Sequence, residues 1–325
     1  MAKGSGSPPR VSSLLALSPK RLIRLRNDVC PYCFRNLGRA LRAEKEHVIG
    51  RRLVPRKSIA AQWNLLMMSC RPCNQKKSRH ESVVSAVSVQ PDVFGRYAKA
   101  GELLKQEAAR KGTVRHPQTG RAIHQSQTKH EVHGTLIAGA TFSATFVGPP
   151  QPPFEDVDAL AHMQVQAIFF LLTRTKNEKN GKALPGIFCT VAEAMRSDWG
   201  NVRLKAFATL TENWLPRFRG VGASGFFKAI IRRHPEEKDI WSWALEWNQA
   251  IRVAGFLGDE ALVNERVGSL PFPRMSNWLA QPDGSQIRMG FDEELPEAED
   301  NLFSERGFNV DAKKSCRGPG QGVVT

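Results

Sequence analysis

The chain is poor in cysteine and has no long apolar run. Six cysteines among 325 residues are too few for a disulfide scaffold, so we expect a reducing compartment, the cytoplasm. A membrane-spanning helix needs about 18 or more consecutive apolar residues. The longest candidate, residues 159–173, is broken by His162, Gln164 and Gln166. We therefore expect no membrane partner.

The N-terminal residues also lack the apolar core of a secretory signal. We expect a loose basic tail over residues 1–17 and a second flexible tail over residues 311–325. Acidic residues are scarce near the start, since residues 1–82 hold 18 Lys and Arg against four Asp and Glu. They carry most of the net charge of +16. A polyanion such as DNA is the simplest partner for this segment, with RNA not excluded; a merely solubilising basic surface is the alternative.

Four of the cysteines form two tight Cys-x-x-Cys pairs, Cys30 with Cys33 and Cys70 with Cys73. Each pair presents two thiolates from one sharp turn, and two such pairs are the usual way to build a tetrahedral sulfur cage for zinc. The spacing therefore predicts a structural Zn²⁺ bound by all four. The alternative is four buried cysteines without a metal.

Between the pairs lies the dipeptide Glu46-His47. Hydrolysis of a phosphodiester requires a base that deprotonates water and a charge that neutralises the phosphate. A histidine with a pKa near neutrality can act as the base, and a divalent ion can supply the charge. The dipeptide therefore predicts a hydrolytic metal site.

The apolar pattern predicts an α+β chain with two folded parts. We expect helices where apolar residues recur at helical spacing, and strands where short apolar runs end at turn residues. One short helix is expected within residues 14–26, with Ser18 at its start. Four further helices are expected at residues 74–82, 94–110, 156–174 and 203–218. The expected strands are residues 46–49, 65–68 and 135–147, followed by an antiparallel meander at 226–233, 240–247 and 251–257.

The residues of the first part resemble the zinc-containing branch of the HNH endonucleases. The matching segments are residues 46–49, 63–65 and 70–78, flanked by the two cysteine pairs. The resemblance implies a small ββα-metal nuclease fold around one catalytic ion, Mg²⁺ or another divalent metal. It covers about a fifth of the chain, roughly residues 20–85.

The resemblance also implies residue roles. His47 would be the general base, and Asn64 would orient the base or its loop. Glu46 and Asn74 would bind the catalytic ion. Independently of the resemblance, the clustering of basic side chains around the dipeptide and on the following helix predicts contacts with phosphates that do not read sequence. These side chains are Arg51, Arg52, Arg56, Lys57, Lys76, Lys77 and Arg79.

We therefore expect an HNH nuclease domain with a trailing helix at residues 18–111, a linker at 112–134 and an α+β domain of unknown function at 135–310. The predicted activity is metal-dependent endonucleolytic hydrolysis of DNA. The alternative is a zinc-ribbon protein that binds nucleic acid without cutting it. A regulatory ligand or protein at the second domain, as expected of defence or mobile-element systems, is a further possibility.

Overall fold

The computed structural model describes most of the chain between residues 16 and 304. The described ranges are 16–59, 63–91, 95–97, 101–117, 119–126, 128–135, 141–148, 150–175, 178–272, 275–280, 286–290 and 293–304. The expected tails at residues 1–17 and 311–325 therefore lie wholly or largely outside the described residues. The predicted α+β class is confirmed, because a small mixed sheet and a larger antiparallel sheet both pack against helices.

The small sheet contains three strands, β1 (Ile23–Arg24), β2 (Ala43–His47) and β3 (Leu65–Cys70), in the order β1-β3-β2. β2 and β3 are antiparallel, and β1 joins the other edge of β3 in parallel. Helix α1 (Arg71–Ser88) follows β3 without a loop, and a proline in its first turn suits a helix start. The strand predicted at 65–68 and the helix predicted at 74–82 lie within β3 and α1. The strand predicted at 46–49 overlaps β2 only at residues 46–47.

The helix predicted within residues 14–26 is wrong. Leu17 forms a bridge to Phe218, and residues 23–24 form β1. The backbone donates from Ile23 to Asn64 and from Leu25 to Leu66, so its polar groups are satisfied by neighbouring strands. An extended chain can complete two exposed sheet edges at once, and this tertiary pairing overrides the local helix signal.

The larger sheet is the predicted meander with one further strand before it. Its strands are β7 (Leu215–Gly222), β8 (Phe227–Arg233), β9 (Ile240–Trp247) and β10 (Ile251–Gly258), in the order β10-β9-β8-β7. β6 (Ile187–Met195) lies beside β10 and extends the antiparallel sheet to five strands. The turn between β9 and β10 has both central residues, Asn248 and Gln249, in the left-handed region, as a type I′ hairpin requires.

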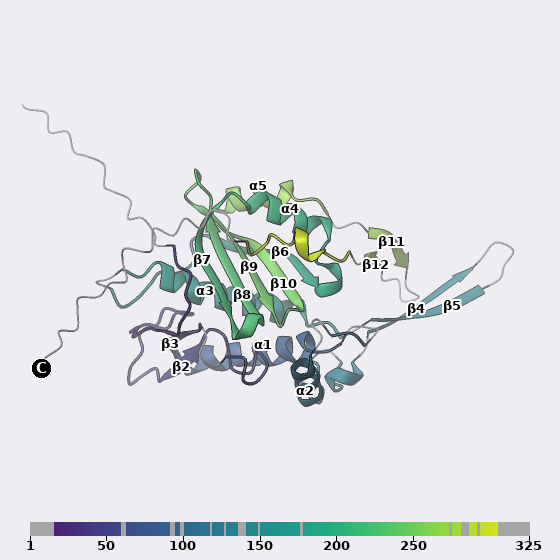
Figure 1. Ribbon diagram of the computed structural model, residues 1–325, viewed down its shortest axis with the longest axis horizontal. Coiled ribbons are helices and arrows are strands. Elements are labelled where there is room, and N and C mark those ends of the chain that lie inside the picture. The colour runs from purple at the N-terminus through teal and green to yellow at the C-terminus, as the bar shows by residue number, and fades with distance from the viewer. Residues whose placement is uncertain are drawn as a thin grey trace, which may run out of the picture.

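Helices cover both faces of this sheet (Figure 1). On one face lie α1 and α3 (Phe154–Leu172), and on the other lie α4 (Val202–Thr211) and α5 (Glu260–Ser269). Alternate residues of β9 reach the two sides, since Trp243 and Leu245 join the core with α3, whereas Ile240 and Ala244 join the core with α4. The helix predicted at 203–218 ends at residue 211, because β7 starts four residues later.

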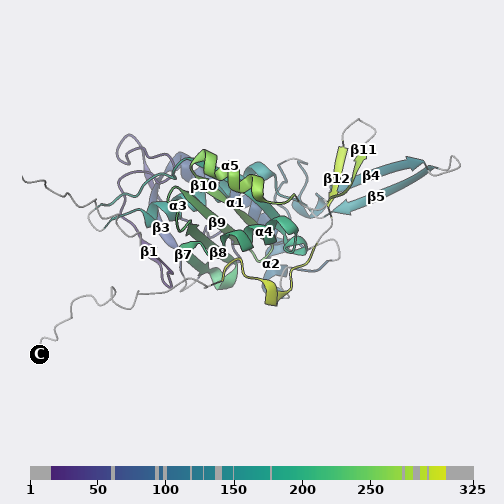
Figure 2. The ribbon, with the colours of Figure 1, turned by 90° about the horizontal axis from the view of Figure 1, so that it is seen from above.

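Two hairpins extend from the body in both ribbon views (Figures 1 and 2). One joins β4 (Thr128–Thr135) to β5 (Thr141–Gly148), and the other joins β11 (Met275–Ala280) to β12 (Gln286–Gly290). The strand predicted at 135–147 corresponds to β5. The predicted linker is partly structured, because its last residues form β4. The trailing helix, predicted at 94–110, starts only at residue 102 and is α2 (Glu102–Lys111). Short 3-10 helices cover residues 123–125, 196–198, 223–225 and 297–299.

The two predicted parts share one hydrophobic core. Trp63, next to β3, packs against Phe218 of β7 and Phe227 of β8, with ring centroids 5.2 and 5.9 Å away. β7 can approach this closely because Gly220 and Gly222 face Trp63 without side chains. The small sheet together with α1, called the small unit below, is therefore fixed to the larger sheet along β7. Within the described ranges, no helix combines the length and apolarity that a bilayer crossing requires.

The close approach at Gly222 predicts a large stability cost for Gly222→Val. An added Cβ would lie 2.8 Å from Cδ1 of Ile49 and 3.0 Å from the Trp63 carbonyl oxygen. We expect the free energy of unfolding to fall by about 1–3 kcal/mol in denaturant titrations. Gly268→Ala is the control, because nothing lies within 4 Å of its added Cβ. Equal stability of Gly222→Val and the parent protein would contradict the packing described.

Candidate zinc site and histidine site

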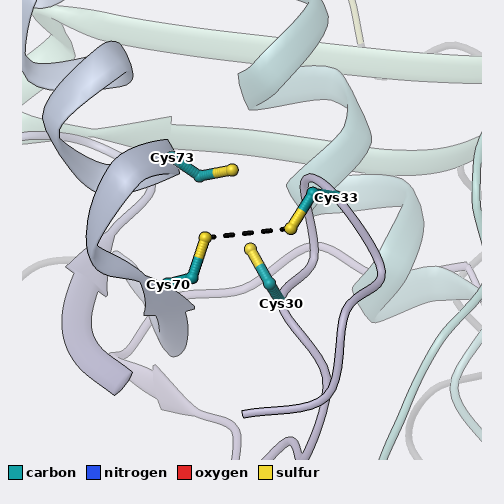
Figure 3. Close-up of side chains that lie close together, drawn as sticks. All are labelled: Cys30, Cys33, Cys70 and Cys73. Atoms are coloured by element: carbon teal, nitrogen blue, oxygen red, sulfur yellow. Dashed lines mark hydrogen bonds between the residues drawn. The ribbon is translucent and has the colours of Figure 1, made fainter. Parts of the chain in front are cut away.

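The four paired cysteines converge on one point (Figure 3). Cys30 and Cys33 lie on the loop before β2, Cys70 ends β3, and Cys73 lies in the first turn of α1. Their sulfur atoms all lie within 4.8 Å of one another, and the Cys33 and Cys70 sulfurs are 3.7 Å apart. Zinc–sulfur bonds of about 2.3 Å in a tetrahedron give sulfur separations of about 3.8 Å. The cluster therefore fits a structural Zn²⁺.

Local backbone geometry builds the first pair of thiols. The Phe34 amide donates to the Cys30 carbonyl, and the Cys30 amide donates to the Arg35 carbonyl. Phe34 has a φ of 57°, so the chain reverses sharply just after Cys33. Burial alone would raise the pKa of Cys33, but hydrogen bonds from Arg35 and neighbouring sulfurs outweigh it and lower the pKa to about 6. Burial raises the pKa of Cys30 and of Cys73 instead, so a thiolate forms more readily at Cys33 than at either of them.

His47 is the last residue of β2, and its side chain is half-buried. Burial lowers the pKa of His47, and the nearby positive charge of Arg51 lowers it further, against an opposing effect of Glu46. The imidazole is therefore neutral at physiological pH and can accept a proton. Among the described residues, no hydrogen bond occupies its ring nitrogens.

The loop after His47 is fixed by side chains from distant segments. Asn64, which is 3% exposed, accepts from the Ile49 amide at 3.1 Å and donates to the Ile49 carbonyl at 2.9 Å. Gln164 of α3 donates to the Val48 carbonyl at 3.1 Å. Asn248 in the β9–β10 turn donates to the Leu53 carbonyl at 2.9 Å. These bonds leave the loop little freedom and so hold the position of His47.

Glu46 lies on the opposite side of β2 from His47, because successive side chains of a strand alternate. Its carboxylate is inside the protein, 4% exposed, and lies 2.7 Å from the Lys77 ammonium. The Tyr32 hydroxyl donates to the same carboxylate oxygen at 3.1 Å. Burial alone would lower the pKa of Lys77, but Glu46 and Glu81 outweigh it and raise the pKa. Glu46 is therefore paired with a permanent cation.

Asn74 is one turn of α1 from Lys77 and has a different partner. Its amide nitrogen donates to Glu44 at 3.0 Å, and no described contact joins it to Glu46 or His47. His80, further along α1, lies 2.6 Å from Asp156. The arrangement expected for a catalytic ion, with Glu46 and Asn74 on one divalent metal, does not fit these residues. The Lys77 ammonium and the Tyr32 hydroxyl both bind Oε1 of Glu46, so this buried carboxylate already has a cationic partner.

The predicted phosphate-contacting residues are exposed, with one exception. Arg51, Arg52, Arg56, Lys57, Lys76 and Arg79 all have exposed side chains. Lys77 is 1% exposed, so in this structure it cannot reach a phosphate, and that prediction needs correction. The error arose because the residues at 76 and 77 look alike in sequence but occupy different faces of α1. Trp63 is 1% exposed and belongs to the core.

The ion pairs of Lys77 with Glu46 and Glu81 were not predicted from the sequence. Lys77 and Glu81 are separated by four residues on α1, and this i,i+4 spacing was a signal for their pairing. Nothing local could indicate Gln164 or Asn248, which come from more than 100 residues away. In the part of the chain that the structure describes, the four cysteines are the one group of metal-ligating side chains close enough to hold an ion.

Comparisons with known proteins found no relative. No family model matches the chain, and neither a curated protein nor a solved structure is similar to it.

The sulfur cluster predicts that the protein binds about one zinc ion per chain. Substitution of a cysteine in the cluster should abolish this binding. Cys30→Ser should lose bound zinc, measured by elemental analysis, and lower the free energy of unfolding by roughly 2 kcal/mol or more. Cys189→Ser is the control, because that cysteine lies outside the cluster. Full zinc content in Cys30→Ser, or none in the parent protein, would refute the assignment.

Proposed function

We propose that the chain is an endonuclease that hydrolyses phosphodiester bonds in DNA, with His47 as the general base. The observation that carries this proposal is the neutral, half-buried imidazole at the end of β2, next to a loop held by Asn64. A general base must be held in place and must be deprotonated at the working pH. His47 meets both requirements. The resemblance to HNH endonucleases supports the same role.

The chemistry assigned to the chain's own residues is limited to proton transfer and charge stabilisation. His47 accepts a proton from a water molecule, and the resulting hydroxide attacks the phosphorus while the bond to the leaving oxygen breaks. Arg51 lies close enough to affect the pKa of His47 and is exposed, so it can bind the phosphate oxygens beside the attacking water. If the mechanism of the family applies, the products carry 5′-phosphates.

Nucleic acid is the substrate best matched to the exposed basic side chains of this part of the chain. Arg51, Arg52, Arg56 and Lys57 are exposed on the loop that follows His47. Lys76 and Arg79 are exposed on α1. Such residues bind phosphates of any sequence and make binding strongly salt-dependent. DNA is the proposed substrate, and RNA shares the phosphate chemistry.

A second function is favoured by the pairing of Glu46. A zinc-stabilised module that binds nucleic acid without cutting needs the cysteines and the basic loop but no catalytic ion. The Lys77 ammonium binds one oxygen of the carboxylate that a catalytic ion would use, which agrees with this second function. The two functions differ in whether DNA is cleaved, so a cleavage assay separates them.

We also propose that the larger sheet regulates the loop after His47. Asn248 binds the Leu53 carbonyl, and its neighbour Gln249 lines a cavity of about 680 Å³. A ligand or protein segment in this cavity would press on the same turn that holds the loop. Occupancy would therefore change how firmly His47 is held.

His47→Ala is expected to abolish nicking of supercoiled plasmid DNA. Loss of a general base typically lowers the rate by about 10²–10⁴-fold. Zinc content and DNA affinity should stay at the level of the parent protein, which excludes unfolding as the cause. His124→Ala provides the control, because the His124 ring binds the Gly112 carbonyl and takes no part in the proposed proton transfer. Undiminished nicking by His47→Ala would remove His47 from the mechanism, and a parent protein that binds but never nicks DNA would favour the second function.

The pH dependence of nicking should report the state of His47. Its pKa is lowered, so the neutral base persists to mildly acidic pH, and activity falls only as the pH drops through a midpoint below about 6.5. Arg51→Gln removes a charge that lowers this pKa, so the midpoint should move to higher pH. Arg52→Gln, an exposed neighbour, should leave it nearly unchanged. A midpoint that is the same in the parent protein and Arg51→Gln would contradict this assignment.

A further inference from the structure

Lys77 is enclosed by oxygen atoms on three sides. Its ammonium lies 2.7 Å from Glu46 Oε1, 2.5 Å from Glu81 Oε1 and 3.0 Å from the His47 carbonyl oxygen. A lysine ammonium has three N–H donors, and these three acceptors use all of them. The group is 1% exposed and so has no free donor for water or substrate.

The oxygens around Lys77 include the Glu46 carboxylate, which was expected to bind the catalytic ion. Glu46 and the His47 carbonyl belong to the end of β2, and Glu81 lies one turn beyond Lys77 on α1. Glu81 is itself held, since the Gly50 amide donates to it at 3.2 Å. Two carboxylates and a carbonyl are the ligand types that hard divalent cations prefer. In this protein they surround a lysine.

We propose that the Lys77 ammonium is the resident cation of this site and takes the place of a divalent ion. The proposal bears on the proposed function, because a nuclease built this way would not use Glu46 to bind a metal. A divalent ion and an ammonium cannot share the same oxygens in a buried setting, because their repulsion is weakly screened there. Removing the ammonium leaves two buried carboxylates without a counter-charge. A divalent cation can then relieve their repulsion.

The test compares neighbouring lysines of α1. Lys77→Met removes the buried ammonium and keeps an apolar chain of similar length, whereas Lys76→Met removes an exposed one. Binding of Mn²⁺ to the zinc-loaded proteins is measured from the electron paramagnetic resonance signal of free Mn²⁺. We expect Lys77→Met to gain about one Mn²⁺ site with a dissociation constant of roughly 1 mM or below. The parent protein and Lys76→Met should not have this site.

The gained site must depend on the carboxylates around Lys77. Adding Glu46→Gln to Lys77→Met should remove Mn²⁺ binding again. A folded Lys77→Met that binds no Mn²⁺ would overturn the proposal. So would a parent protein whose Mn²⁺ binding is lost in Glu46→Gln, because Glu46 would then serve a metal with Lys77 in place.

A second measurement needs no variant and covers the case in which Lys77→Met does not fold. Acylation of surface lysines, read by peptide mass spectrometry, should modify Lys76 at least about tenfold faster than Lys77, because Lys77 reacts only when the site opens. Saturating Mg²⁺ should leave this ratio unchanged. Faster modification of Lys77 in Mg²⁺ would mean that the metal displaces the ammonium, and would refute the proposal. Neither measurement uses cleavage, so each stands apart from the His47 assay.

Discussion

The cluster of four thiols is the constraint on which the small unit depends. It joins the loop before β2 to the junction of β3 and α1, with all four sulfurs within 4.8 Å. That junction sets how α1 crosses β2, and therefore which side chains meet between them. Docking along β7 through Trp63 and two glycines supplies the second restraint. Between them, the cluster and the docked face fix a segment of few strands that would be marginal alone.

The alternation of side chains along β2 separates an acid from a base. Glu46 points inward to Lys77 and Tyr32, whereas His47 lies on the other side beside a basic loop. Adjacent positions in sequence thus have different environments and different roles. The carboxylate is buried inside the small unit, whereas the imidazole is only half-buried. The loop that follows joins them to the larger sheet through Gln164 and Asn248.

The parts of the structure that depend on residue spacing could be predicted from the sequence. The cysteine pairs, the strand before the second pair and the meander were predicted because each depends on local pattern. The strand at residues 23–24 was missed because its partners lie on β3, and the common core of the two parts was missed because β7 follows 150 residues later. Exposure also escaped prediction: only the packing of α1 against β2 distinguishes Lys77 from Lys76.

The central claim is that the four cysteines bind the metal ion of the small unit, and that the Lys77 ammonium neutralises the buried Glu46 carboxylate. The most direct measurement is a crystal structure of the zinc-loaded protein grown with Mn²⁺, with anomalous diffraction recorded at the absorption edges of both metals. The account predicts a zinc peak among Cys30, Cys33, Cys70 and Cys73, and no manganese peak at Glu46. A manganese peak bound by Glu46 and Asn74, with Lys77 turned away, would contradict it.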